Sequence, residues 1–259
     1  MHPILLQLGP FHLYSWGAMV ALGFLAGILF ILWLAKNEGM AWDNILDLAF
    51  YVLLASIIGA RLFYVIQFWR DFQGNVWRVL AVQEGGLVFY GGFLGVLAVI
   101  ALYVYLKKLN IWKLLDVIAP GVALGYAIGR LGCFLNGCCY GVATSLPWGI
   151  SFPAGSLANY AFGVKPLHPT QLYGALAGLL IFIILMLIRR YKKFDGMVVL
   201  IGIMLYSAYR FAIEFIRTNP TYFWHLTGNP CQGTYRDFTQ LTRKLAAPQK
   251  ITSTPMVAL

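Results

Sequence analysis

The feature that most constrains the fold of this chain is a series of six long apolar runs. They cover approximately residues 15–35, 45–68, 86–106, 115–138, 172–188 and 197–216. A helix needs about 20 apolar residues to cross the hydrocarbon core of a bilayer. Within that core, only helices and closed barrels satisfy all backbone hydrogen bonds. The runs therefore predict an all-α, polytopic membrane helix bundle with about six transmembrane helices.

The composition excludes an ordinary soluble domain. Hydrophobic residues make up 60% of the chain and charged residues only 11%, whereas soluble domains carry about 25% charged residues. On a soluble protein, the net charge of +10 would suggest nucleic acid. Here the basic residues gather in short loops, where they set orientation and attract anionic lipid. We expect membrane lipid as a partner and no nucleic acid.

Lysine and arginine divide unevenly between alternate loops. One set of loops holds Lys36, Lys107, Lys108, Lys113, Arg189, Arg190, Lys192 and Lys193. The other set, before the C-terminal tail, holds Arg70, Arg78 and Lys165. The positive-inside rule assigns the first set to the cytoplasm, so the N-terminus and segments 69–85 and 140–171 are expected outside. Residues 1–217 would form the membrane domain, and the polar residues 218–259 a disordered or atypical tail.

Three arginines fall inside apolar runs, where charge is costly and usually functional. Arg210 has Glu214 one turn later, which allows an internal ion pair. Arg61 could equally be structural, with its side chain reaching the headgroups, or belong to a site. Arg130 has no acid at helical spacing, so it is the best candidate to hold an external anion. At that depth the available anions are phospholipid phosphates, which guanidinium groups bind in a bidentate manner.

Glycines recur in the fourth run and open the third. Gly121 and Gly125 lie four residues apart, which favours close helix packing. Gly129 continues the spacing, and the glycine density beyond it suggests that backbone approaches a ligand. The pair Gly91-Gly92 allows the same two interpretations.

Three cysteines lie within seven positions and allow several interpretations. Cys133, Cys138 and Cys139 could be small buried hydrophobes, or could form disulfides on the outer side of the membrane. With His168 they would make a strained zinc set. A cysteine nucleophile would need a positive neighbour, and Arg130 lies three residues before Cys133.

Residues 129–141, Gly-Arg-Leu-Gly-Cys-Phe-Leu-Asn-Gly-Cys-Cys-Tyr-Gly, resemble the signature of the bacterial prolipoprotein diacylglyceryl transferases. Other segments match the family in the same order, namely 8–10, 15–17, 59–61, 90–92, 147–149, 168–173 and 210–215. The likeness covers roughly residues 5–220. Members of the family usually have seven spans.

The resemblance implies an enzyme of the bacterial cytoplasmic (inner) membrane, with its active site toward the outer leaflet. The family moves a diacylglyceryl group from phosphatidylglycerol to the lipobox cysteine thiol of a prolipoprotein. A thioether forms and glycerol phosphate leaves. Phosphatidylglycerol and prolipoproteins are thus the expected partners, and neither a cofactor nor a metal is expected.

The resemblance also implies roles for individual residues. Arg130 takes the place of the phosphatidylglycerol-binding arginine of the family. Arg210 and Glu214 take the places of a second essential arginine and its partner. The further residues expected to bind substrate are Trp16, Arg61, Asn136, Gly141 and His168.

The sequence departs from the usual family pattern at several positions. Trp16 replaces a tyrosine, and Tyr90 replaces the histidine before the paired glycines. Cys133 replaces an asparagine and Cys138 a glutamate. Gly174 stands where glutamate is usual. The proton-handling positions have therefore changed more than the phosphate-binding ones.

In the expected mechanism, Arg130 and Arg210 neutralise charge growing on the leaving phosphate. The base is open between Tyr90, Glu214 and His168. Because tyrosine ordinarily titrates near 10, we expect Tyr90 to position groups in the catalytic site. Two alternatives remain: a non-catalytic lipid-binding or transport protein, and a thiol enzyme that uses the three clustered cysteines on another acceptor.

Overall fold

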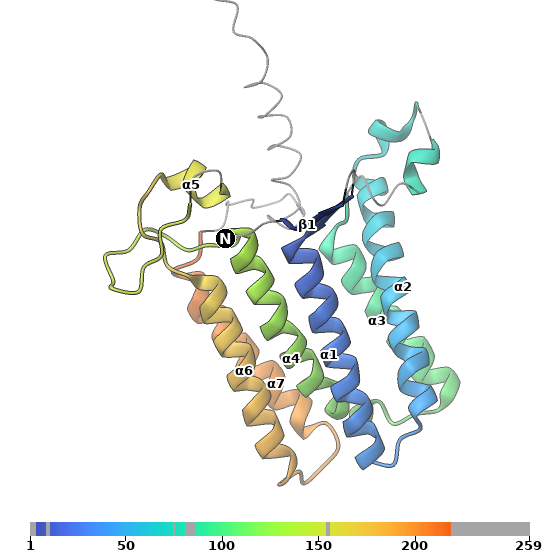
Figure 1. The fold of residues 1–259 in the computed structure, drawn as a ribbon. Helices are drawn as coiled ribbons and strands as arrows, with labels where there is room; N and C mark the ends of the chain where they lie inside the picture. The colour runs from blue at the N-terminus through green and yellow to red at the C-terminus, as the bar shows by residue number, and fades with distance from the viewer. Residues whose placement is uncertain (1–3, 9–10, 75, 81–85, 154–155, 219–259) are drawn as a thin grey trace, which may run out of the picture.

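The computed structural model describes residues 4–8, 11–74, 76–80, 86–153 and 156–218. In that part of the chain, six helices are long and apolar enough to cross a membrane. They are α1 (Ser15–Asn37), α2 (Trp42–Gln67), α3 (Phe89–Lys107), α4 (Ile111–Asn136), α6 (Thr170–Arg189) and α7 (Met197–Glu214). The predicted all-α, polytopic bundle is thus confirmed (Figure 1). The expected tail lies outside the described residues, except for Thr218.

Short elements lie at one end of the bundle. Strands β1 (Ile4–Leu8) and β2 (Phe11–Tyr14) form an antiparallel hairpin before α1. No sequence pattern predicted this hairpin. Two 3₁₀ turns, η1 (Trp69–Phe72) and η2 (Val76–Leu80), follow α2, and the short helix α5 (Leu157–Phe162) lies between α4 and α6. Figure 1 shows the hairpin, the turns and α5 at the same end.

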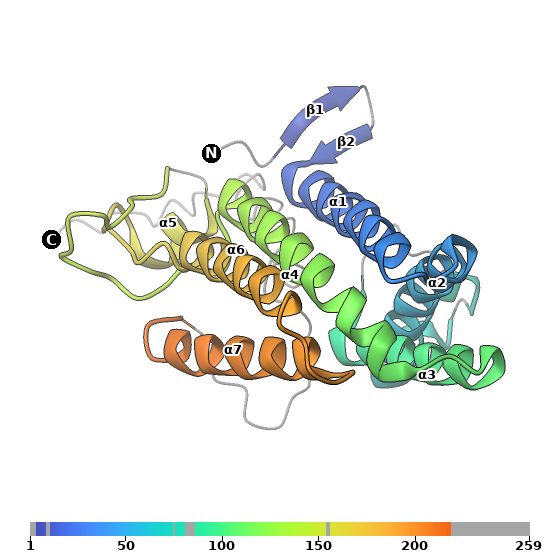
Figure 2. The ribbon, with the colours of Figure 1, turned by 90° about the horizontal axis from the view of Figure 1, so that it is seen from below.

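Helix α4 is the centre of the bundle. It packs against α1, α6 and α7, while α2 and α3 form a second pair that lies beside α1 (Figure 2). The helix ends and connections opposite the hairpin carry the eight basic residues that the loop pattern groups on one side.

Glycines make the contact between α1 and α4. A Cβ atom at Gly23 would lie 2.7 Å from the carbonyl oxygen of Gly125, and one at Gly27 would lie 2.9 Å from that of Gly121. Only glycine lets the two backbones approach so closely. The predicted packing role of Gly121 and Gly125 is confirmed. In contrast, a Cβ at Gly129 would meet nothing within 4 Å.

The pair α2 and α3 is joined in the same way. A Cβ at Gly91 would overlap the carbonyl oxygen of Gly59, and one at Gly92 would lie 2.9 Å from the carbonyl oxygen of Ser56. The paired glycines therefore serve helix packing. Tyr90, immediately before them, is 49% exposed at the start of α3.

A buried acid fixes α7 at the end opposite the hairpin. Asp116, only 3% exposed, accepts hydrogen bonds from the backbone N–H groups of Gly196 (2.8 Å) and Val199 (2.9 Å). Its carboxylate also lies 3.2 Å from Nζ of Lys192. These N–H groups at the start of a helix have no partner within it. Asp116 thus satisfies them and anchors α7 to α4.

Candidate functional site

The signature segment folds into a tight turn at the end of α4. Gly137 adopts a left-handed conformation (φ 69°) and ends the helix after Asn136. The N–H of Cys138 then donates to the carbonyl oxygen of Cys133 at 3.2 Å. Cys139 is also left-handed (φ 61°), a conformation that is uncommon for residues other than glycine. The two left-handed residues reverse the chain and bring the three cysteines together.

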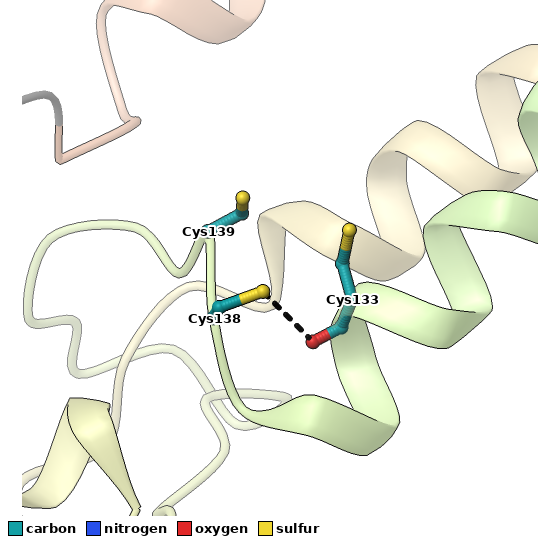
Figure 3. A group of neighbouring side chains, drawn as sticks. All are labelled: Cys133, Cys138 and Cys139. Atoms are coloured by element: carbon teal, nitrogen blue, oxygen red, sulfur yellow. Dashed lines mark hydrogen bonds between the residues drawn. The ribbon is translucent and has the colours of Figure 1, made fainter. Parts of the chain in front are cut away.

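The sulfur atoms of Cys133, Cys138 and Cys139 lie within 4.8 Å of one another (Figure 3). Cys133 and Cys139 are not part of a disulfide, whereas Cys138 is disulfide-bonded. The dashed contact in Figure 3 joins Sγ of Cys138 to the carbonyl oxygen of Cys133 at 3.7 Å. Three sulfur atoms are one short of the four ligands of a structural zinc site. The fourth expected ligand, His168, instead has its Nδ1 atom 3.3 Å from the hydroxyl of Tyr173.

The start of α6 holds this turn in place. Thr170 donates its hydroxyl to the carbonyl oxygen of Cys139 at 2.6 Å, and Gln171 donates its amide to that of Cys138 at 2.7 Å. Both side chains are buried. The N–H of Gly141 donates to the carbonyl oxygen of His168 at 2.9 Å. Two segments that were singled out separately in the sequence, 129–141 and 168–173, thus form one unit.

The segment after α7 completes the unit. Gly141 forms a β-bridge with Arg217, and a Cβ at Gly141 would lie 2.6 Å from the carbonyl oxygen of Ile216. The Arg217 side chain hydrogen-bonds Cys139, and its Nε atom is buried without a hydrogen-bond partner. Arg217 was not among the residues predicted for the site. No spacing rule relates it to Cys139, and it sits at the border of the polar tail.

These neighbours change the acidity of Cys139. A hydrogen bond from Cys133, together with the positive charges of Arg217 and Arg130, lowers the pKa of Cys139 to about 6, although burial acts in the opposite direction. A thiol with such a pKa is largely a thiolate at neutral pH.

Arg130 lies one turn before Cys133 on α4. Its guanidinium carbon is 4.9 Å from the centroid of the Tyr126 ring, a cation–π contact. The arginine is half-buried, and no carboxylate of the described residues forms an ion pair with it. A Cβ at Gly174 would lie 3.1 Å from Cδ of Arg130 and 2.9 Å from the hydroxyl of Tyr209. Gly174 therefore leaves the room that the Arg130 side chain occupies.

Tyrosines of α4 and α7 surround Arg130. The ring centroids of Tyr126 and Tyr206 lie 5.5 Å apart, and those of Tyr126 and Tyr209 lie 6.5 Å apart. The hydroxyl oxygen of Tyr126 is buried beside Tyr209 and Arg130. Tyr206 interacts electrostatically with Arg130 and Arg210. The two arginines thus approach one patch of tyrosines.

Arg210 forms the expected ion pair with Glu214 along one face of α7. The two side chains are 36% and 50% exposed. The sequence spacing predicted this pair. The ion pair leaves the guanidinium accessible at the end of the bundle that carries the hairpin.

Arg61 lies apart from this group. It is 6% exposed, and its guanidinium donates to the carbonyl oxygens of Arg78 (2.6 Å), Val79 (2.8 Å) and Gly86 (3.2 Å). Its Cζ atom also lies 5.5 Å from the ring centroids of Tyr64 and Phe72. The arginine thereby fastens the connection between α2 and α3.

The remaining expected site residues are Trp16, Asn136, His168 and Tyr90. Trp16 adjoins the signature, since its side chain hydrogen-bonds the Cys133 sulfur. Asn136 is the last residue of α4, and it is half-buried beside the turn. His168 belongs to a chain of contacts at the connection between α4 and α6, in which the hydroxyl of Tyr173 accepts a hydrogen bond from Trp148 at 2.8 Å. The ring centroid of Tyr90 lies 5.8 Å from that of Phe89.

Residues 3–257 match the family model described as prolipoprotein diacylglyceryl transferase. The chain belongs to this family. It is 39% identical over 210 residues to the phosphatidylglycerol--prolipoprotein diacylglyceryl transferase of Finegoldia magna, covering 80% of each chain. It is 35% identical over 222 residues to the protein of the same name from Clostridium tetani, covering 85% of this chain and 87% of the relative. A relative of that name from Geobacter sulfurreducens is 36% identical over 219 residues, with 83% and 82% covered.

The family match covers the whole of the described bundle and extends into the tail. The arginine, tyrosine and cysteine groups at the ends of α4 and α7 therefore lie within the part of the chain that is shared with these transferases.

Proposed function

We propose that this protein transfers a diacylglyceryl group from phosphatidylglycerol to the lipobox cysteine thiol of a prolipoprotein. The thiol sulfur would bond to the glycerol carbon that carries the phosphate, and the carbon–oxygen bond to phosphate would break. The products are a thioether and glycerol phosphate. The family membership supports this reaction class, and the arginine groups supply the charge that it needs.

The observation that carries the proposal is the environment of Arg130. Its guanidinium stacks on Tyr126 and has no carboxylate partner among the described residues, so its charge is available to an anion. Nε of Arg217 is also buried without a hydrogen-bond partner. Buried polar groups are normally satisfied, and a lipid phosphate would satisfy groups of this kind. We assign the phosphate of phosphatidylglycerol to Arg130.

Arg210 would act on the same phosphate from α7. Glu214 orients its side chain, and Tyr206 lies in the field of both arginines. Charge grows on the phosphate as the glycerol carbon–oxygen bond breaks. Fixed cations that stabilise such charge commonly contribute about 10²–10³ in rate each.

The remaining expected residues take supporting roles in this proposal. Arg61 holds the connection between α2 and α3, because its donors already contact three carbonyl oxygens. Trp16, Asn136 and Gly141 border the turn that carries Cys139, where the acceptor thiol would enter. Tyr90 and His168 are left as positioning groups for the lipid and for the outer loop.

We further propose that the protein lies in the bacterial cytoplasmic membrane with this site toward the outer leaflet. The site is at the end of the bundle opposite the loops that carry eight Lys and Arg residues. The positive-inside rule places those loops in the cytoplasm. The N-terminus would then be outside, where secreted lipoprotein precursors arrive.

The test is rescue of a bacterium depleted of its own transferase, with lipidated precursor followed on a gel. Purified protein with phosphatidylglycerol and a lipobox peptide should also release glycerol phosphate. Lipid binding without release of glycerol phosphate would instead identify a non-catalytic lipid-binding protein.

A further inference from the structure

The proposed transfer assigns no role to the thiols of Cys133 and Cys139, and no residue is yet assigned as its proton acceptor. The acceptor thiol must lose a proton to become a nucleophile. Tyr90 is exposed at the start of α3, and the Glu214 carboxylate is paired with Arg210. Nδ1 of His168 faces Tyr173. The position of the base is therefore open.

We propose that Cys139, held between Cys133 and Arg217 at the turn after α4, is the proton acceptor for the incoming lipobox thiol. This inference rests on the proposed transferase function and assigns its missing catalytic group.

Contacts with neighbouring segments fix the position of Cys139. Its backbone is left-handed, a conformation that persists in a residue with a side chain only when its surroundings enforce it. Thr170 holds its carbonyl oxygen at 2.6 Å, and Gly141 two residues later is bridged to Arg217. Figure 3 shows the Cys139 and Cys133 side chains extending from the turn and from the helix end toward the same space. The thiol is thus placed beside the arginine group and half-buried.

The charges that face Cys139 favour its thiolate. Cys133 donates a hydrogen bond to it, and Arg217 and Arg130 act on it from the segment after α7 and from α4. Tyr140 is the next residue. Burial and the negative charge of Cys139 raise the pKa of Tyr140, so this hydroxyl stays protonated near neutral pH. A base works best when its pKa lies near the working pH, and the lowered pKa of Cys139 meets this condition.

The step balances without a further reactant. The lipobox thiol gives its proton to the Cys139 thiolate, and its sulfur electron pair attacks the glycerol carbon of phosphatidylglycerol. The carbon–oxygen bond breaks, and its electron pair leaves on the glycerol phosphate held by Arg130. The Cys139 thiol then passes its proton to the departing phosphate or to water. Direct attack by Cys139 would instead leave a stable thioether on the enzyme, from which the lipid could not be passed on.

The test is the pH dependence of glycerol phosphate release by the full-length protein in phosphatidylglycerol micelles with a lipobox peptide. The wild-type rate should fall as the pH drops through the pKa of Cys139, because the thiolate is lost. Cys139→Ser removes the base and should lower the rate by about 10²–10⁴-fold. Cys139→Asp keeps an ionisable base, so it should recover part of the rate. Its acid limb, the low-pH side of the pH–rate profile, should move to lower pH.

Cys133→Ser is the matched variant, because it keeps the base but replaces the thiol that stabilises it. It should stay active with its acid limb moved relative to wild type. This readout does not depend on whether Cys139→Ser folds. A wild-type rate in Cys139→Ser, or identical acid limbs in wild type, Cys133→Ser and Cys139→Asp, would overturn the assignment. An inactive wild-type protein would overturn the transferase function itself and the base with it.

Discussion

The guanidinium carbon of Arg130 lies 4.9 Å from the ring centroid of Tyr126, one turn earlier on α4. The ring stabilises the cation but, unlike a carboxylate, does not neutralise its charge. Gly174 on α6 leaves space for the arginine stem, and the Tyr126 hydroxyl is buried beside the guanidinium. The pair therefore forms a preformed cation and hydroxyl at the end of α4.

Removal of the Tyr126 ring should weaken this arrangement. A cation–π contact contributes about 0.5–2 kcal/mol, so Tyr126→Leu should raise the KM for phosphatidylglycerol by about 2–30-fold. Tyr126→Phe keeps the ring and should show a smaller rise, which reports the hydroxyl alone. Steady-state kinetics with varied phosphatidylglycerol measure both. Tyr105→Leu, at the highly exposed end of α3, is the control, and an equal effect there would contradict the contact.

Arg61 should matter for stability more than for lipid binding. Arg61→Lys removes the planar guanidinium group, which donates hydrogen bonds to three carbonyl oxygens. Hydrogen bonds to charged groups contribute about 1.5–3 kcal/mol each, so thermal unfolding in detergent should occur at a clearly lower temperature. Arg70→Lys, exposed in the same connection, should leave unfolding unchanged. A selective rise in the KM for phosphatidylglycerol at normal stability would instead place Arg61 in the lipid site.

Asp116 should be a stability residue at the cytoplasmic end proposed above. Asp116→Ala leaves two N–H groups of α7 and the Lys192 ammonium without their shared partner. Breaking a buried ion pair by removing one partner costs about 3–5 kcal/mol, so the free energy of unfolding should fall by a similar amount. Asp195, which also pairs with Lys192, is exposed. Asp195→Ala should therefore change unfolding little, and an equal effect of both variants would refute the anchoring role.

The Arg210–Glu214 pair allows activity and stability to be separated. Both side chains are substantially exposed, and exposed ion pairs contribute only about 0–1 kcal/mol to stability. Arg210→Ala should therefore fold normally yet transfer lipid more slowly, while Glu214→Gln should have the milder effect on the rate. Thermal unfolding and glycerol phosphate release, measured on the same preparations, check this. Equal activity of Arg210→Ala and wild type would remove Arg210 from the site.

Local patterns in the sequence were enough to predict the bundle. The run at 45–68 corresponds to α2 at Trp42–Gln67, because the length of an apolar run and the need to satisfy the backbone set both its type and its extent. The fourth run was extended to residue 138, whereas α4 ends at Asn136, since Gly137 turns left-handed. Glycine is the common residue at that position after a helix, so this boundary could have been recognised.

The site was less predictable, because it depends on contacts between distant segments. The spacing of Arg210 and Glu214 predicted their ion pair, but nothing in the sequence relates Arg217 to Cys139, or Thr170 to the carbonyl oxygen of Cys139. The sequence left Arg61 open between a structural role and a site, since the carbonyl oxygens that it contacts carry no sequence signal. Tertiary packing alone brings these groups together.

The most direct test of the central claim compares wild type with Arg130→Ala and Arg130→Lys in one assay of glycerol phosphate release, with phosphatidylglycerol varied. If Arg130 holds the lipid phosphate, kcat/KM should fall by about 10²–10³-fold in Arg130→Ala. Arg130→Lys should recover only part of it, because lysine cannot form the bidentate contact. Unchanged kcat/KM in a folded Arg130→Ala protein would contradict the account.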